Sequence, residues 1–243
     1  MKEPDFNLAL FGNPVAHSLS PRIHHLFAEQ LHLNVEYWAH NVAEGAFEIA
    51  LNRFREEGGI GLNVTVPYKA LAASFCCRLD AMAKVTGVVN TMIATEEGWI
   101  GDNTDGDGLL WDMVENLKWP MRGSEVYVIG AGGAAAGIVP SLLESGVGHV
   151  TIASRRLAQA QGLIDKLVLL KKERLSACRL AELTLKPDCV IVNATSCGHH
   201  GTCPDLPEPP TGTLAYDLNY GAVAEPFLRW AEERGLTASD GLG

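Results

Sequence analysis

The fold is decided by one short stretch of the chain, residues 126–135, which reads VYVIGAGGAA. Val126 to Ile129 form an apolar run that suits a buried parallel strand, and a helical pattern begins at about Ala134. Between strand and helix the glycines fit the pattern G-x-G-x-x-G/A in the context that this motif requires. The predicted dinucleotide-binding positions are Gly130, Ala131, Gly132, Gly133, Ala134 and Ala135. A glycine-rich turn that binds nothing is the plain alternative.

The next apolar run, Val150 to Ala153, ends in residues that bear on the choice of cofactor. NAD-binding proteins usually place Asp or Glu there, where the carboxylate accepts a hydrogen bond from the ribose 2'-hydroxyl. This chain has Ser154, Arg155 and Arg156 instead. Two guanidinium groups suit a 2'-phosphate, because their planar donors form charge-assisted bonds with its oxygens. The sequence therefore favours NADP, with a solvated basic turn as the alternative.

Apolar runs alternate with helical patterns along the rest of the chain, which is typical of βαβ units. The predicted strands are 8–11, 35–39, 62–66, 88–94, 99–100, 126–129, 150–153, 189–193 and 214–217, and the predicted helices are 21–31, 44–55, 105–117 and those beginning near 134 and 157. Ser20 is the predicted N-cap of the first helix. We predict an α/β fold of two domains with a cleft between them. Residues 1–105 form a mostly parallel substrate-binding and catalytic domain, and residues 106–243 form a Rossmann-like, doubly wound NADP domain.

Composition limits the class of protein and its partners. The chain has 243 residues, of which 47% are hydrophobic and 20% charged, so it can bury a core. Its formal net charge of -10 gives no electrostatic basis for binding nucleic acid. The six cysteines form no C-x-x-C pair, and the first residues carry acidic groups and Pro4 where an export signal would be basic and then apolar. We expect a cytoplasmic protein with free thiols, no membrane partner and no metal, acting as a monomer or homodimer on a small molecule.

Eight short runs, in order and spacing, closely resemble those of the shikimate dehydrogenases. They are FGNPVAHSLSP (11–21), NVTVPYK (63–69), GVVNT (87–91), GDNTDG (101–106), GAGGAAAG (130–137), NATSCG (193–198), YDLNY (216–220) and SDGLG (239–243). The resemblance covers essentially the whole chain. It implies reversible, NADPH-dependent reduction of 3-dehydroshikimate to shikimate in aromatic amino acid biosynthesis.

The resemblance also implies roles for particular residues. Lys69 and Asp105 would form the catalytic dyad. The implied substrate contacts are Ser18, Ser20, Thr65, Asn90 and Tyr220. The implied cofactor contacts beyond the glycine loop are Ser154, Arg155, Arg156, Thr195, Leu218 and Gly241, the last beside the nicotinamide. From the residues alone, a solvated lysine at a helix start is the preferred interpretation of Lys69, and simple capping is as good an interpretation of Ser20 as carboxylate binding.

Two departures from the family pattern keep other functions open. The usual Asn-Arg-Thr cofactor motif is Ser154-Arg155-Arg156 here, and Gln159 stands where an arginine is common. In the family, a helix follows the segment that matches SDGLG, returns toward the first domain and supplies a glutamine to the substrate. The alternatives are a quinate/shikimate dehydrogenase of broader specificity and, if that helix is absent, a non-catalytic NADP- or metabolite-binding module. His199, His200, Cys197 and Cys203 lack zinc-site spacing and are expected in a flexible surface loop.

Overall fold

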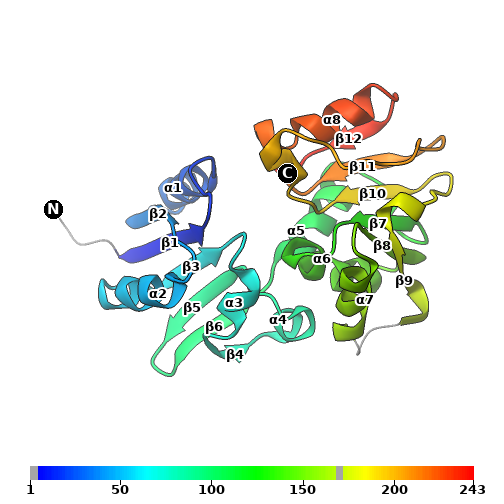
Figure 1. The fold of residues 1–243 in the computed structure, drawn as a ribbon. Helices are drawn as coiled ribbons and strands as arrows, with labels where there is room; N and C mark the ends of the chain where they lie inside the picture. Colours follow the sequence, from blue (N-terminus) through cyan, green and yellow to red (C-terminus); the bar gives the residue numbers. More distant parts are fainter. Residues whose placement is uncertain (1–4, 168–171) are drawn as a thin grey trace. The chain divides into compact units, whose positions relative to one another are not determined.

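The chain folds into two units, each built on its own sheet. A computed structural model describes residues 5–167 and 172–243. The units are Met1–Thr104 and Asp105–Gly243, and each contains a six-stranded sheet (Figure 1). The predicted two-domain α/β fold is thereby confirmed, while the cleft and the assignment of roles to the two domains stay predictions.

The first sheet is mostly parallel, with one antiparallel strand near its middle. Its order is β2 (Val35–Asn41), β1 (Phe6–Gly12), β3 (Gly61–Val64), β5 (Thr91–Thr95), β6 (Gly98–Asp102) and β4 (Cys76–Leu79). β1 pairs in parallel with β2 and β3, whereas β5 is antiparallel to both β3 and β6. β5 and β6 therefore form a hairpin that turns at residues 95–98.

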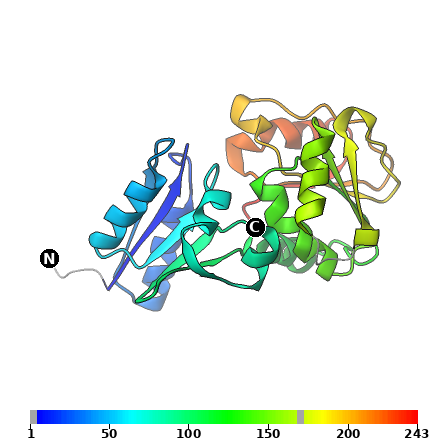
Figure 2. The same ribbon diagram turned by 60° about the horizontal axis from the view of Figure 1, so that its bottom comes forward.

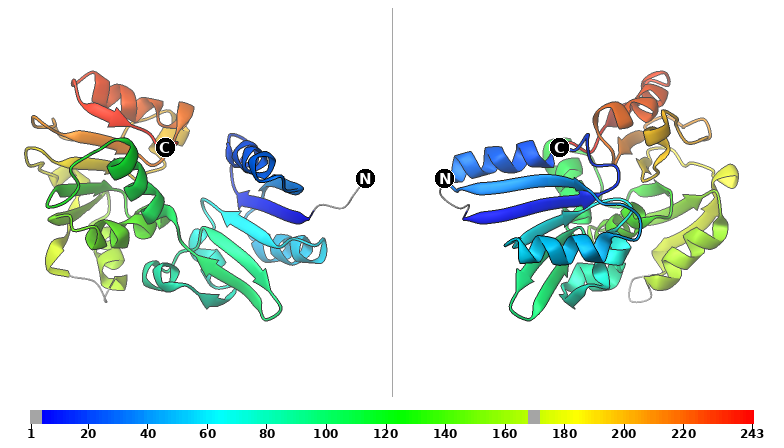
Figure 3. Two further views of the ribbon diagram at one scale, coloured as in Figure 1. Left: turned by 180° about the vertical axis from the view of Figure 1, so that it is seen from behind. Right: turned by 60° about the vertical axis from the view of Figure 1, so that its left-hand side comes forward.

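Helices cover both faces of the first sheet. Figure 3 shows α1 (Ser20–Leu31) and α2 (Phe47–Glu56) on opposite sides of β1. Alternate residues of β1 pack on the two faces of the sheet. Ala9 and Phe11 pack with Phe47 and Leu51 of α2, while Leu10 packs with Tyr37 on the other side. This alternation explains why a fully apolar run forms a central parallel strand.

Two short elements of the first unit were not predicted, β4 (Cys76–Leu79) and α4 (Ala81–Thr86), whereas α3 (Lys69–Ala73) begins at the helix start suggested for Lys69. Among the described strands, β4 pairs with β6 alone and lies at the sheet edge. An edge strand needs little apolar alternation, so its CCRL sequence gave no signal.

The second sheet is parallel at each of its described pairings. Its order is β12 (Thr237–Ser239), β11 (Leu214–Asp217), β10 (Val190–Asn193), β7 (Glu125–Ile129), β8 (His149–Ser154) and β9 (Leu175–Arg179). Numbered from β7, this is the doubly wound order of dinucleotide-binding folds. Figure 2 shows α6 (Gly133–Glu144) and α7 (Leu157–Lys166) in front of the strands, and α8 (Glu225–Glu232) packs its Phe227 and Trp230 against Tyr127, Ile129 and Ile191.

The predicted helix at 105–117 has an unexpected second half. It begins as α5 (Asp105–Trp111) and continues as the π-helix η1 (Asp112–Asn116). The buried Asp112 carboxylate accepts hydrogen bonds from the Tyr216 hydroxyl and from Asn116 Nδ2, each at 2.7 Å. We attribute the wider turn to these bonds, which the spacing of apolar residues does not report. The other short helices are the 3-10 turns η2 (Lys172–Arg174), η3 (Leu180–Glu182), η4 (Cys197–His200) and η5 (Gly221–Val223).

Three elements of the second unit were not predicted from the sequence. They are β9, α8 and β12, which are short or carry mixed polarity. His199 and His200 are exposed, as expected for a surface segment, and lie in the turn η4, while the half-buried Cys203 packs against the apolar cluster beneath α8. Among the described residues, no helix is long and apolar enough to cross a membrane.

Candidate active site

The predicted substrate-binding residues of the first unit lie in segments at one edge of its sheet, the edge formed by the carboxyl ends of the parallel strands. β1 and β3 both end there, at Gly12 and Val64. Because β5 is antiparallel, with Thr91 opposite Asn63, its first residue lies at the same edge. Thr91 is in turn opposite Asp102, the last residue of β6. The segments that carry Ser18, Thr65, Asn90 and Thr104 therefore begin side by side, as expected for a ligand site at the ends of parallel strands.

Asn90 joins two of these segments through its side chain. Its Nδ2 donates to Thr104 Oγ1 at 3.0 Å, and its Oδ1 accepts from the Thr104 backbone N–H at 3.1 Å. The Thr91 hydroxyl also donates to Asn90 Oδ1, at 2.9 Å. Asn90 therefore fixes the backbone of Thr104, the last residue of the first unit.

Lys69 is held near Asn90 by its main chain. Lys69 is the first residue of α3, and its carbonyl accepts from the Val89 N–H at 2.9 Å. The turn before it is anchored at Thr65, whose N–H donates to Phe11 O and whose carbonyl accepts from Tyr68 N–H, both at 2.9 Å. The structure thus brings Thr65, Lys69 and Asn90 to one edge of the sheet. The pairing of Lys69 with Asp105 stays a prediction.

The two predicted carboxylate-binding serines contact each other. Ser18 Oγ donates to Ser20 Oγ at 3.1 Å, and the Ser20 N–H donates to Ser18 Oγ at 3.2 Å. The predicted N-cap role of Ser20 is wrong: Ser20 is the first residue of α1 and Leu19 occupies the cap position. Ser18 satisfies a first-turn N–H in its place, because the chain enters the helix one residue earlier than Pro21 suggested.

One polar pair beneath this edge was missed from the sequence. The Tyr37 hydroxyl donates to Asn63 Oδ1 at 2.7 Å, and Asn63 Nδ2 donates to Asn90 O at 3.4 Å and to Thr91 Oγ1 at 3.3 Å. His24 stacks on Tyr37 with ring centroids 4.1 Å apart. Burial, and secondarily the charge of His25, lowers the pKa of His24. The amide of Asn63 inside an apolar strand was the available signal.

The glycine loop of the second unit has the geometry that a pyrophosphate requires. Gly130 has φ +108°, and a Cβ there would lie 3.0 Å from Ala194 O. Within the described part of the chain, nothing lies within 4 Å of where a Cβ of Gly132 would stand. α6 begins at Gly133, and no described side chain caps its first turn or places a carboxylate in it. The N–H groups of its first turn and the positive end of its dipole therefore favour an anion at this helix start.

Gly130→Ala tests this loop. A Cβ at φ +108° is strained for any L side chain, and it would press on the backbone of Ala194. We expect the free energy of unfolding to fall by about 1–3 kcal/mol. Urea unfolding measures this, with Gly162→Ala on the open side of α7 as the control. Equal stability of the two variants would contradict the assigned loop geometry.

The residues predicted for the adenosine phosphate follow β8. Ser154 is buried and accepts from the Arg156 N–H at 3.4 Å, while Arg155 and Arg156 are exposed. A third guanidinium was missed from the sequence: Arg179, which ends β9, lies opposite Ser154 in the strand register. Only prediction of β9 would have placed Arg179 at this edge.

The remaining predicted cofactor residues follow β10, β11 and β12. Leu218 donates its N–H to Asn193 O at 3.0 Å, and Gly241 donates its N–H to Asn219 O at 2.9 Å. A Cβ on Gly241 would lie 2.5 Å from Leu218 O, so only glycine permits this approach of the two backbones. The structure brings Thr195, Leu218 and Gly241 together at the ends of neighbouring strands. Tyr220, two residues beyond Leu218, is half-buried.

A buried carboxylate, Asp217, lies among these strand ends. It is 0% exposed and accepts hydrogen bonds from the side chains of Asn193 and Asn219. Burial raises the pKa of Asp217 to about 6, against the lowering effect of the hydrogen bonds, and the charge of Asp240 raises it further. The group is thus mostly ionised at neutral pH.

This raised pKa predicts a pH dependence of stability. Because the pKa is higher in the folded chain than the ordinary value of 3.8, Asp217 favours folding most below a pH of about 4 and loses that contribution as pH rises to about 6. As the pH rises from about 4 to about 6, we expect the free energy of unfolding of the protein to fall by about 3 kcal/mol relative to that of the Asp217→Asn variant. Urea unfolding of both proteins at several pH values measures the difference. A difference that stays constant across that range would contradict the prediction.

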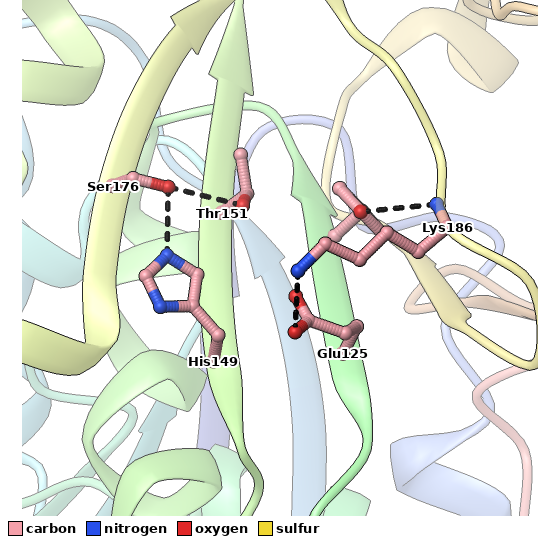
Figure 4. Close-up of polar contacts among 6 residues, drawn as sticks. Glu125, His149, Thr151, Ser176 and Lys186 are labelled. Atoms are coloured by element: carbon pink, nitrogen blue, oxygen red, sulfur yellow. Dashed lines mark hydrogen bonds and ion pairs between the residues drawn. The ribbon is translucent and has the colours of Figure 1, made fainter.

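A different polar cluster lies at the amino ends of the strands of the second sheet (Figure 4). His149 Nε2 lies 2.9 Å from Ser176 Oγ, which is 3.1 Å from Thr151 Oγ1. Lys186 Nζ is 2.8 Å from Glu125 Oε1. These contacts join β8 to β9 and tie the segment before β10 to the start of β7. They lie at the amino ends of the strands, away from the edge where such folds bind ligands.

The fold and the site define a two-domain, dinucleotide-binding α/β protein. Residues 10–92 match the family described as shikimate dehydrogenase substrate binding domain, and residues 113–200 match shikimate / quinate 5-dehydrogenase. The shikimate dehydrogenase (NADP(+)) of Alkalilimnicola ehrlichii is 42% identical over 238 residues, which cover 97% of this chain and 87% of that protein. The chain belongs to the shikimate dehydrogenase family.

Further relatives agree in sequence and in fold. The shikimate dehydrogenase (NADP(+)) of Xylella fastidiosa strain M12 is 41% identical over 246 residues, covering 99% of this chain and 86% of that protein. The crystal structure of shikimate 5-dehydrogenase from Thermus thermophilus in complex with NADP(H) and shikimate is 31% identical, with a TM-score of 0.81, and the match covers 98% and 87% of the two chains. An Ael1 enzyme from Pseudomonas putida has a TM-score of 0.85 and 34% identity, with 98% and 88% covered.

Proposed function

We propose that this protein is an NADP-dependent shikimate dehydrogenase, which reversibly reduces 3-dehydroshikimate to shikimate with NADPH. The observation that carries the proposal is the open glycine loop at the start of α6, followed along the chain by Ser154, Arg155 and Arg156 in place of an acidic residue. Membership of the family supplies the substrate class.

The second unit would hold the cofactor. The N–H groups at the start of α6 would bind the pyrophosphate, and the guanidinium groups of Arg155 and Arg156 would bind the 2'-phosphate. Thr195, Leu218 and Gly241 would border the nicotinamide end. When bound, the nicotinamide supplies the hydride.

The first unit would hold the substrate and move the proton. Ser18 and Ser20 would donate hydroxyl hydrogen bonds to the ring carboxylate, with Thr65 and Asn90 on the ring hydroxyls and Tyr220 contributing from the second unit. Charge develops on the carbonyl oxygen during reduction, and the Lys69 ammonium would stabilise it and donate a proton. A carboxylate at ~4 Å, as proposed for Asp105, stabilises that ammonium by roughly 4 kcal/mol before desolvation at an effective dielectric of ~20. In the oxidation direction the same pair would accept the proton.

Steady-state rates test the proposal. Shikimate and quinate are each assayed with NADP and with NAD, by following the absorbance of the reduced cofactor. We expect the highest kcat/KM for shikimate with NADP. Comparable values for quinate would favour the broader quinate/shikimate dehydrogenase, which the description of the family at residues 113–200 includes. Binding of NADP without turnover of either acid would favour a non-catalytic module.

We further propose a cytoplasmic location, supported by free thiols at all six described cysteines. The oligomeric state, monomer or homodimer, is measured by light scattering of the full chain.

A further inference from the structure

The ionised carboxylate of Asp217 accepts three hydrogen bonds from two asparagine residues, Asn193 and Asn219. Asp217 Oδ2 accepts from Asn193 Nδ2 at 2.8 Å. Asp217 Oδ1 accepts from both the backbone N–H and the Nδ2 of Asn219, each at 2.8 Å. Asp217 and Asn193 are 0% and 1% exposed, so water does not substitute for these partners. A buried carboxylate is costly unless it is satisfied in this way.

Asp217 determines which way the Asn193 amide points. A carboxylate only accepts, so the Asn193 atom that faces it must be the NH₂ group. The carbonyl oxygen of Asn193 is then directed at Thr195, where it accepts from the backbone N–H at 3.1 Å and from the hydroxyl at 2.8 Å. The reversed amide would set an acceptor against the Asp217 carboxylate and a donor against the Thr195 N–H. Asp217 therefore imposes one orientation on Asn193.

Thr195 is fixed through this pair. In addition to its two bonds to Asn193, its Oγ1 accepts from the Cys197 N–H at 3.3 Å, and its carbonyl accepts from Asn219 Nδ2 at 3.2 Å. The backbone N–H, hydroxyl and carbonyl of Thr195 are all engaged. Both amides that hold Thr195 are themselves held by Asp217.

A second branch of the network reaches Gly241. The Asn219 carbonyl accepts from the Gly241 N–H at 2.9 Å, and Gly241 packs directly on the carbonyl of Leu218. Thr195, Leu218 and Gly241 lie on three separate loops. One carboxylate thus sets the relative positions of all three.

We propose that Asp217 is a positioning residue for the nicotinamide end of the NADP site, and that it acts by fixing the amide orientations of Asn193 and Asn219. The proposal rests on the proposed function, since it takes Thr195, Leu218 and Gly241 as the border of the cofactor. Asp217 itself is buried and acts only through the loops it holds.

An exchange of the two side chains tests the proposal. Asp217→Asn alone places the new NH₂ group against the NH₂ group of Asn193 or Asn219. Otherwise it reverses the Asn193 amide, so that the Asn193 NH₂ group faces the Thr195 N–H. Asn193→Asp alone sets two carboxylates face to face. In the double variant Asn193→Asp with Asp217→Asn, each donor again meets an acceptor. The carboxylate now at position 193 accepts from Thr195 and from the amide now at position 217, and the oxygen of that amide accepts from Asn219.

We expect each single variant to raise the Kd for NADPH and the KM for NADP about tenfold, because a buried donor or acceptor is left unsatisfied. The KM for shikimate should stay within about twofold. The double variant should return the NADPH affinity to within about twofold of the unaltered protein. Asp205→Asn, at an exposed position of the Pro-rich loop, is the control and should change none of these values.

The readouts separate positioning from stability alone. NADPH binding is followed by its fluorescence, and folding by thermal melts of the same samples. The proposal is overturned if folded single variants keep their NADPH affinity, or if the double variant fails to fold or binds as weakly as the singles. If both singles unfold, a folded double variant of normal affinity supports it. Absence of NADPH binding by the unaltered protein would instead count against the proposed function.

Discussion

Replacing Lys69 with alanine should lower kcat for shikimate oxidation by about 10²- to 10⁴-fold, which is the usual contribution of a general acid or base. The reason is that the alanine variant has no group that exchanges a proton with the reacting oxygen. The Kd for NADPH should not change, because the proposed cofactor contacts all lie in Asp105–Gly243 and Lys69 lies in Met1–Thr104. Stopped-flow or steady-state absorbance gives kcat, and fluorescence gives the Kd.

Lys84→Ala is the matched control for this variant. Lys84 is an exposed lysine in the last turn of α4 in the same unit. Its removal should leave kcat within about twofold, as is usual for an exposed surface residue. A Lys69 variant that keeps the full kcat would show that this lysine is only a solvated residue at a helix start.

Replacing Arg155 and Arg156 together with alanine should raise the KM for NADP by about 10²-fold and change the KM for NAD little. A hydrogen bond to a charged group contributes about 1.5–3 kcal/mol, and two such groups would contact the 2'-phosphate. NAD has no such phosphate, so its binding is the internal reference. Initial rates at varied concentrations of each cofactor measure the effect.

Arg229→Ala is the control for the Arg155/Arg156 variant, because it removes one surface guanidinium group. Arg229 is exposed on α8 and pairs with Glu225, and exposed pairs of this kind contribute about 1 kcal/mol or less. It should leave both KM values unchanged. If the Arg155/Arg156 variant loses NADP and NAD affinity equally, the two arginines do not read the 2'-phosphate. Arg179, opposite Ser154 in register, then becomes the remaining guanidinium to test.

The parts of the site that were predictable depend on contiguous sequence. The strand, glycine loop and helix around Gly130 follow one another in the chain, so their arrangement follows from local pattern and backbone geometry. The same holds for Ser154 to Arg156, which directly follow β8. By contrast, Thr65, Lys69 and Asn90 meet only because β5 pairs antiparallel with β3, a long-range pairing that no local pattern specifies.

The buried polar groups were not predictable from periodicity. Asn193 and Asp217 each end an apolar strand, and the two are opposite each other in the register of β10 and β11. Prediction of that parallel pairing would have suggested their contact. Prediction of the antiparallel pairing of β3 with β5 would likewise have placed Asn63 opposite Thr91. The π-helical turn at Asp112 includes a hydrogen bond from Tyr216, 104 residues away, which the helical pattern of residues 105–117 does not contain.

Transfer of an isotopic label measures directly whether this protein moves a hydride from NADPH to 3-dehydroshikimate. NADPH deuterated at the transferred position is incubated with 3-dehydroshikimate and the full chain, and the product is examined by mass spectrometry and NMR. We expect shikimate that carries one deuterium on the ring carbon bearing the new hydroxyl group, formed at the rate of NADPH oxidation. Unchanged 3-dehydroshikimate, or shikimate without deuterium on that carbon, would contradict it.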